Sequence, residues 1–324
     1  MGKLALVGNL AMYNLCTTWR CARRWHASQP RRWSPRDILG LVRYVECPRD
    51  SWQGLHHTLP TEVKVAYLRT LIGSGFRWLD LASFVSPKWV PQMADSEAVL
   101  AQLPAPAPLG ADYLAIVLNR RGLERALACP QVTSLGFPLS LSETFQVRNS
   151  AMDTAAAWAF LEELVVEVAA AGRRLVVYLS MGFGNPYGDP YQVSDLRPAV
   201  ARGLDLGVRD WAVADTIGRA SPQLVDQVAQ SLSRWFEGLH FGLHLHARPE
   251  HTGALVTAAQ RAGVRWIEGA LGGVGGCPFA ADALVGNLAT EEVARYSDLG
   301  FAVSEQHLRE LAALAKRLST SGTL

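Results

Sequence analysis

The chain has 324 residues, of which 49% are hydrophobic and 19% are charged, and its formal net charge is +2. This apolar content is enough for a large core and excludes a disordered chain, while the small net charge gives no sign of a nucleic-acid partner. No run approaches the roughly 20 apolar residues that a membrane span needs, so we expect a soluble globular protein of one large domain or two ordinary ones.

The first 36 residues differ from the rest of the chain because they hold seven basic residues and no acidic one. An arginine-rich leader without acidic residues is typical of a mitochondrial transit peptide, but a flexible extension, or a start codon assigned too far upstream, explains it as well. We favour a flexible basic extension over residues 1–38 and a cytoplasmic protein, with the mitochondrial matrix as the alternative. The basic residues are Lys3, Arg20, Arg23, Arg24, Arg31, Arg32 and Arg36.

The cysteines give no sign of a disulfide framework. They are odd in number and form no CxxC pair, so a zinc ribbon is not indicated either. A reducing compartment fits this usage best. The five are Cys16, Cys21, Cys47, Cys129 and Cys277.

From about residue 40 onward, short β-rich runs alternate with longer helical patterns. This alternation is typical of βα units around a parallel sheet, and eight such units favour a closed (β/α)8 barrel over an open doubly wound sheet. The barrel domain is therefore expected over residues 39–324. The expected strands are 41–46, 78–82, 113–118, 133–137, 174–179, 210–215, 240–245 and 265–269.

The segments between the strands carry apolar residues at the three- and four-residue spacing of amphipathic helices. Residues 290–318 add two helical stretches after the last strand, whereas residues 101–110, with three prolines and one glycine, predict a connecting loop inside the domain. The clearest expected helices are 61–72, 152–171, 194–206, 221–236 and 250–262.

Polar residues gather where the expected strands end, which is where the active site of a (β/α)8 barrel forms. His244 and His246 are two residues apart on a strand, so their side chains should project together into the barrel mouth. With Asp50 and Asn287 available from neighbouring strand ends, they make a mixed nitrogen and oxygen site for a divalent cation plausible. Such a set suits Mg²⁺ or Mn²⁺ better than structural zinc.

The glycine cluster at 272–276 has two interpretations. A glycine-rich turn can hold phosphate through its backbone N–H groups, but this one lacks both Walker and dinucleotide spacing. We favour a mobile loop whose glycine hinges let Cys277 close over bound substrate. The alternative for Cys277 is a buried free cysteine that acts as a small hydrophobic residue.

Six ordered motifs resemble the 3-hydroxy-3-methylglutaryl-CoA lyases, a family of metal-dependent barrel enzymes whose superfamily also includes isopropylmalate and homocitrate synthases. The resemblance covers roughly residues 41–320, and the longest motif is typical of the lyase branch. The motifs are 48–50 (PRD), 83–93 (SFVSPKWVPQM), 215–218 (DTIG), 244–246 (HLH), 275–278 (GGCP) and 286–291 (GNLATE).

The resemblance implies cleavage of 3-hydroxy-3-methylglutaryl-CoA, or of a close 3-hydroxyacyl-CoA, to acetyl-CoA and acetoacetate by metal-assisted retro-Claisen chemistry. It implies that Asp50, His244, His246 and Asn287 hold the cation. The catalytic residues it implies are Arg49, which would polarise the substrate carbonyl, Asp50, Asp80, Asp215 and Cys277. The substrate-binding residues it implies are Arg49, Gln53, Ser142, Asn149, Tyr178 and Thr216.

The chain departs from the family pattern around these residues, which bears on the acyl group more than on the chemistry, because neighbouring groups orient metal ligands. Asp80 stands where the family has glutamate, Ala247 where it has aspartate, and Ala212 where it has serine. Cys47, Ser51 and Ala214 replace glycines, and Asn185 stands where many lyases have cysteine.

Two other functions remain open from the sequence. A condensing enzyme of the same superfamily is disfavoured by the lyase-like motif at 83–93, and a catalytically silent barrel is disfavoured because all four expected metal ligands are present. We expect an acyl-CoA substrate, no nucleic-acid or membrane partner, and leave a homodimer open.

Overall fold

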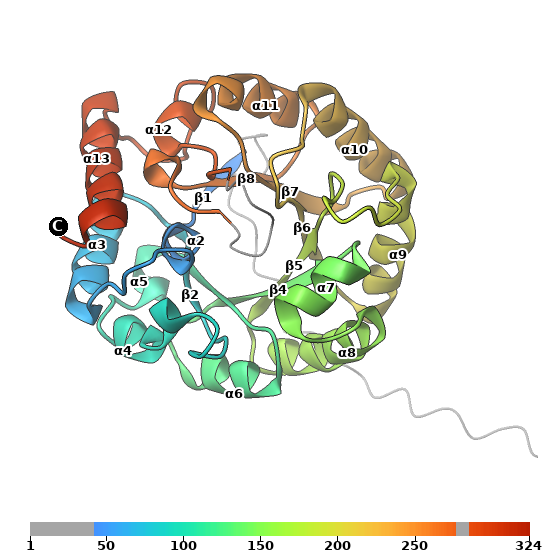
Figure 1. Ribbon diagram of the computed structural model, residues 1–324, viewed down its shortest axis with the longest axis horizontal. Coiled ribbons are helices and arrows are strands. Elements are labelled where there is room, and N and C mark those ends of the chain that lie inside the picture. The colour runs from blue at the N-terminus through green and yellow to red at the C-terminus, as the bar shows by residue number, and fades with distance from the viewer. Residues whose placement is uncertain (1–41, 277–284) are drawn as a thin grey trace, which may run out of the picture. The chain divides into compact units, whose positions relative to one another are not determined.

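The computed structural model describes residues 42–276 and 285–324, and within them eight parallel strands close into a barrel in chain order, with β1 pairing with β8 (Figure 1). The helices lie outside the strands and surround them. The predicted barrel is therefore confirmed. The strands are β1 (Arg43–Glu46), β2 (Trp78–Ser83), β3 (Asp112–Ile116), β4 (Ser134–Ser140), β5 (Arg174–Ser180), β6 (Asp210–Asp215), β7 (His240–Leu245) and β8 (Trp266–Gly269).

The helices follow the predicted order. Several begin at side chains that accept a hydrogen bond from the first turn, as Asn119, Ser142, Asp153, Ser221 and Ser304 do. The helices are α2 (Pro48–Gln53), α3 (Thr61–Gly73), α4 (Ser96–Ala101), α5 (Pro106–Leu109), α6 (Arg120–Ala128), α7 (Glu143–Ser150), α8 (Thr154–Ala170), α9 (Leu196–Leu206), α10 (Pro222–Trp235), α11 (Pro249–Arg261), α12 (Thr290–Val293) and α13 (Glu305–Ser321), with short 3₁₀ turns η1 (Pro91–Met93), η2 (Val193–Asp195) and η3 (Leu271–Gly273).

One prediction needs correction, because the expected loop at 101–110 is not entirely irregular. The last residue of α4 and the one-turn helix α5 lie within it. Proline suits the first turn of a helix, where its missing N–H has no partner to lose, and Gly110 ends this one with a left-handed φ of 60°. The prolines that predicted a loop therefore also permit a single helical turn.

Two apolar layers hold the barrel together. A large outer layer fills the space between strands and helices, and a small inner layer, which includes Val45, Cys47 and Tyr178, fills the barrel itself. Trp266 packs into this interior over Gly242, where an added Cβ would lie 2.2 Å from the indole. The interior is therefore filled by side chains, which leaves the mouth for chemistry.

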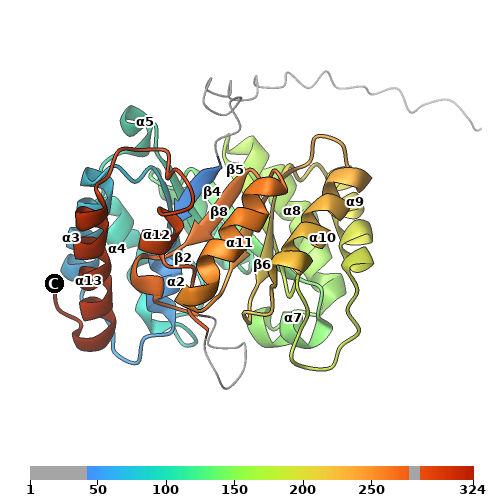
Figure 2. The same ribbon diagram turned by 90° about the horizontal axis from the view of Figure 1, so that it is seen from above.

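The chain's last helix, α13, lies beside α3 in both views (Figure 2). His57 Nε2 lies 3.0 Å from the Leu318 carbonyl oxygen, and Ser74 Oγ lies 2.8 Å from His307 Nε2. The two helical stretches predicted after the last strand are thus α12 and α13. No helix among the described residues is long and apolar enough to cross a membrane. The basic extension predicted for residues 1–38 lies outside the described residues.

Candidate active site

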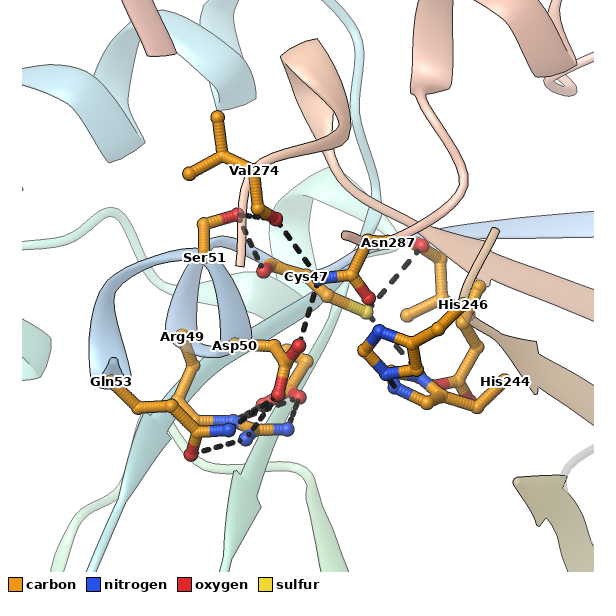
Figure 3. A network of polar contacts seen from close by, with 12 residues as sticks. Cys47, Arg49, Asp50, Ser51, Gln53, His244, His246, Val274 and Asn287 are labelled. Atoms are coloured by element: carbon orange, nitrogen blue, oxygen red, sulfur yellow. Dashed lines mark hydrogen bonds and ion pairs between the residues drawn. The ribbon is translucent and has the colours of Figure 1, made fainter. Parts of the chain in front are cut away.

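Five of the predicted site residues lie together near the ends of β1 and β7 (Figure 3): Arg49, Asp50, His244, His246 and Asn287. Helix α2 begins two residues after β1 with Pro48 in its first turn, so Arg49 and Asp50 follow the strand end directly and are 7% and 4% exposed. His246 follows β7 and forms an isolated bridge with Asn287. Segments far apart in the sequence therefore bring their polar side chains to one buried place.

The two histidines point the same way, as their spacing predicts. His246 Nδ1 lies 3.0 Å from the Val285 carbonyl oxygen, which can only accept, so this nitrogen carries the proton. His244 Nδ1 donates to Glu268 Oε2 at 2.9 Å. The Nε2 atoms of both rings face each other at 3.1 Å. Two ligands bound at right angles to one ion at about 2.1 Å lie about 3 Å apart, so this separation fits a shared cation.

Asp50 and Asn287 complete the set. A nitrogen of each histidine and an Asp50 oxygen all lie within 4.8 Å of one another. Asn287 Nδ2 donates to Asp50 Oδ2 at 2.7 Å and to the Val274 carbonyl at 2.9 Å. Its Oδ1 is buried without a hydrogen-bond partner among the described residues. A buried acceptor left unpaired is unfavourable, and a cation at this position would satisfy it.

Ionisation states also suit metal binding. Burial alone would raise the pKa of Asp50, but Arg49 and His244 outweigh it and hold that pKa at about 2. Burial and the neighbouring His244 lower the pKa of His246 to about 4. At neutral pH the site therefore offers a carboxylate and a neutral imidazole, which are the forms that bind metal.

Arg49 is held rigidly beside these residues. Its Nε donates to the two Asp80 oxygens at 3.0 and 3.2 Å, and its Nη2 also contacts Asp80. Its Nη1 donates to Asp50 Oδ1 at 3.0 Å and to Gln53 Oε1 at 2.9 Å. A guanidinium has five N–H groups, so one N–H of Nη2 has no partner among the described residues. Burial raises the pKa of Asp80 to about 6 despite the opposing effect of Arg49.

Glu268 is a site residue that the sequence analysis missed. It is 1% exposed, and its Oε1 accepts a hydrogen bond from Trp266 Nε1 at 2.8 Å while its Oε2 accepts from His244. A carboxylate on the second nitrogen of a metal-binding histidine fixes the ring and its tautomer. The only signal in the sequence was a single acidic residue within an otherwise apolar strand.

Two of the predicted catalytic or substrate-binding residues make hydrogen bonds that hold loops. Both Asp215 oxygens accept backbone N–H groups, from Arg219 at 2.9 Å and from Ala220 at 2.7 Å. Ser142 caps α7 through the N–H of Phe145 at 3.1 Å and contacts Asp189.

The remaining predicted residues differ in whether they lie near the histidine pair. Thr216 Oγ1 accepts the N–H of Met181 at 3.3 Å, and Asn149 lies on α7, partly buried. Tyr178 does lie in the site: its ring meets the His244 ring edge-on at 6.1 Å, and its buried hydroxyl has no partner among the described residues. Cys277 lies outside the described residues.

The described part of the glycine cluster packs tightly against α2. Gly275 has a φ of 105°, and a Cβ there would lie 2.8 Å from the Asp50 carbonyl oxygen. Ser51 Oγ lies 3.4 Å from the Val274 carbonyl oxygen, and the Leu271 N–H donates to Glu46 Oε1 at 2.8 Å. These contacts hold residues 271–276 in place. At least some of these glycines therefore allow close packing, in addition to the hinge that we predict.

Comparison with known proteins gives a consistent result. The HMGL-like family model matches residues 45–316. A hydroxymethylglutaryl-CoA lyase of Bacillus subtilis is 32% identical over 247 residues, which cover 76% of this chain and 81% of the relative. The hydroxymethylglutaryl-CoA lyase of Pseudomonas mevalonii is 31% identical over 248 residues, covering 76% and 80%.

Solved structures agree. The crystal structure of the Bacillus subtilis HMG-CoA lyase has a TM-score of 0.78 at 28% identity and covers 86% of this chain and 94% of its own. An HMG-CoA lyase from "Acenitobacter baumannii", in complex with coenzyme A and 3-methylmalate, has a TM-score of 0.76 at 27% identity and covers 88% and 96%.

Proposed function

Because this chain belongs to the HMGL-like family, we propose that it cleaves 3-hydroxy-3-methylglutaryl-CoA, or a close 3-hydroxyacyl-CoA, to acetyl-CoA and acetoacetate or the corresponding keto acid. It is an enzyme of the lyase class, of the hydroxymethylglutaryl-CoA lyase type. The observation that carries the proposal is the buried set of Asp50, His244 and His246, beside an asparagine oxygen that has no partner among the described residues.

We assign the cation to Asp50, His244, His246 and Asn287, because an Asp50 oxygen and a nitrogen of each histidine converge beside the unpaired Asn287 oxygen. The donor set is that of Mg²⁺ or Mn²⁺ rather than of a structural zinc site. A cation bound there supplies Lewis-acid polarisation of the hydroxyl and carbonyl oxygens of the substrate.

Arg49 is the residue that we assign to the charge that develops on the thioester oxygen. When the bond between C2 and C3 breaks, the C3 hydroxyl gives up its proton and its oxygen becomes the ketone oxygen of the keto acid. The electron pair of the bond moves into the departing acetyl group as an enolate, which takes up a proton to become acetyl-CoA. The free N–H of Arg49 can donate to the thioester oxygen, and the clamp by Asp80 and Gln53 fixes its direction beforehand. Gln53 and Asp80 therefore act through Arg49.

Tyr178 and Cys277 are assigned to the substrate. The Tyr178 ring lies edge-on to the His244 ring, and its buried hydroxyl has no partner within the described ranges, so it can donate to a substrate oxygen. We propose that Cys277 closes over the substrate, on the strength of its glycine-flanked position in the sequence. Asp215 holds the loop after β6 through its carboxylate, and we keep it as a residue that positions the substrate.

The test is release of acetyl-CoA from a panel of 3-hydroxyacyl-CoA thioesters by the purified chain, before and after treatment with a chelator. We expect activity that the chelator abolishes and that Mg²⁺ or Mn²⁺ restores. His246→Ala should lose both activity and bound Mn²⁺, whereas His251→Ala, an exposed residue of α11, is the matched control.

The outcomes separate the alternatives. Condensation of acetyl-CoA with a keto acid at a higher rate than cleavage would identify a synthase. Metal binding without turnover of any thioester would identify a silent barrel. Neither outcome is expected: the motif at 83–93 is typical of the lyases, and the buried Asp50, His244 and His246 beside the clamped Arg49 argue against a silent barrel.

A further inference from the structure

A second group of metal-binding atoms lies beneath the proposed cation site. The Cys47 Sγ, a His244 nitrogen and a Glu268 oxygen all lie within 4.8 Å of one another, and the three side chains are buried. The Cys47 sulfur lies 3.9 Å from Glu268 Oε2, which in turn lies 2.9 Å from His244 Nδ1. In Figure 3 the Cys47 side chain points toward the histidine pair. None of the roles assigned above uses this thiol.

We propose that Cys47, Glu268 and His244 form a second cation position, which takes a thiophilic divalent ion such as zinc or cadmium. Thiolate, imidazole and carboxylate are ligands that such ions prefer, whereas Mg²⁺ favours oxygen. In tetrahedral zinc sites neighbouring ligand atoms are about 3.3–3.6 Å apart, given bonds of about 2.0–2.3 Å. The separations of 2.9 Å between His244 Nδ1 and Glu268 Oε2 and of 3.9 Å between Cys47 Sγ and Glu268 Oε2 need adjustments of only a few tenths of an ångström to match. The third pair, Cys47 Sγ and a His244 nitrogen, lies within 4.8 Å.

The surroundings of Cys47 include polar groups as well as apolar ones. The residue belongs to the inner apolar layer, yet its thiol also contacts the Glu268 carboxylate and the Val45 carbonyl oxygen, at 3.9 and 3.7 Å, which a cysteine that only fills space does not need. Tyr178 belongs to the same inner layer and lines a small cavity together with Glu268. Its buried hydroxyl, which lacks a partner within the described ranges, is available as a fourth ligand.

The two cation positions share His244 and therefore exclude each other. For the first position His244 needs its proton on Nδ1, where Glu268 accepts it, and its lone pair on Nε2. For the second position the proton moves to Nε2, where His246 Nε2 at 3.1 Å can accept it, and the thiol proton of Cys47 leaves to solvent. A thiophilic ion in the second position thus removes one ligand from the first. Only this exclusion rests on the proposed function; the Cys47 position itself does not.

The test uses Cd²⁺ as the probe on the full-length protein, followed by thiolate-to-cadmium absorption in the ultraviolet and by equilibrium dialysis. We expect Cys47→Ala to lose one thiolate's share of the absorption and to bind cadmium at this position at least about tenfold more weakly. Cys129→Ala removes the other described free cysteine, which is also buried, and should behave as the wild type. A Cys47→Ala titration that overlays the wild-type curve would overturn the proposal.

Two further measurements keep the proposal testable if Cys47→Ala does not fold and check that the two cation positions exclude each other. If Cys47→Ala does not fold, Cys47→Ser keeps the size of the side chain and should show the same loss of thiolate absorption. Cadmium should also displace bound Mn²⁺, seen by electron paramagnetic resonance, from the wild type but not from Cys47→Ala at the same concentration. Simultaneous binding of Mn²⁺ and of cadmium at Cys47 would refute the exclusion. Failure of Mn²⁺ to bind without cadmium would count against the proposed function alone.

Discussion

Arg49 and Asp80 form a buried ion pair in which one guanidinium nitrogen reaches both carboxylate oxygens, at 3.0 and 3.2 Å. Asp80 is fully buried and Arg49 is 7% exposed, so neither charge can turn to solvent if its partner is removed. Breaking a buried pair from one side is strongly destabilising because it leaves a charge uncompensated. The pair therefore has two effects. It stabilises the contact between β2 and α2, and it fixes the orientation of Arg49, the arginine that we assign to catalysis.

Asp80→Asn keeps the shape of the side chain and removes its charge. We expect the free energy of unfolding to fall by about 3 kcal/mol and turnover to fall at least about tenfold, since Arg49 is then free to turn toward Asp50. Denaturant titration and acetyl-CoA release would measure the two effects. Glu124→Gln is the control, because it breaks an exposed pair with Arg120 and should change stability by less than about 1 kcal/mol. Equal effects of the two substitutions would contradict this account.

Glu46 makes stability depend on pH. It is fully buried, and burial raises its pKa to about 8, although hydrogen bonds from Thr290 and Leu271 oppose the rise. The folded protein therefore holds a proton that Glu46 in the unfolded chain releases near its ordinary pKa of 4.5. Between these two pH values the folded state binds more protons, so the free energy of unfolding falls as the pH rises, by up to about 1.4 kcal/mol per unit.

Glu46→Gln copies the protonated form and should remove this slope. Denaturant titrations at several pH values from 5 to 8 are expected to show a flatter profile than the wild type. Glu62→Gln, on the exposed side of α3, should leave the slope unchanged. A Glu46→Gln profile as steep as that of the wild type would show that Glu46 is already ionised across this range.

The sequence predicts the barrel because each strand is a short, largely apolar run and each long helix carries a regular apolar face. The ends of the strands are predicted less well than the strands themselves. β4 continues to Ser140, beyond the predicted residue 137, because its pairing with β5 continues to Ser180. The one-turn helix α5 was missed because a single turn among prolines has no periodicity to detect.

The sequence predicted site residues only where the spacing of residues along a strand determines which way their side chains point. The interval between His244 and His246 forces both rings to one side of a strand, and the structure places Asp50 and Asn287 beside them. Glu268 was missed because its contact with His244 joins neighbouring strands β7 and β8, and no local pattern reveals it. Asp215 was named through its motif, but its hydrogen bonds are all local, within five residues along the chain.

Gly275 offers a test of whether the glycine cluster sets the metal ligands. A Cβ at this position would lie 2.7 Å from Asn287 Nδ2 and 2.8 Å from the Asp50 carbonyl oxygen. Gly275→Ala should therefore displace both proposed ligands and weaken Mn²⁺ binding at least about tenfold. Gly300→Ala is a matched control, because Gly300 also has a positive φ, 82°, but nothing lies within 4 Å of an added Cβ. Both variants share the backbone strain, of order 1 kcal/mol, so only the difference between them reports the contact. Equal Mn²⁺ affinities in the two variants would rule out this role.

Cys277 is where a catalytic and a structural interpretation differ most. If it closes over bound substrate, Cys277→Ser should lower turnover severely while leaving the melting temperature nearly unchanged, because a loop residue adds little packing. Cys129→Ser is the control with the opposite pattern, since Cys129 is buried between α6 and β4 and should lose stability without losing turnover. Alkylation gives an independent measurement in a protein whose other four cysteines are replaced: bound substrate should protect the Cys277 thiol, whereas a core thiol would resist the reagent with or without substrate. Full activity after complete alkylation of that protein would remove Cys277 from the mechanism.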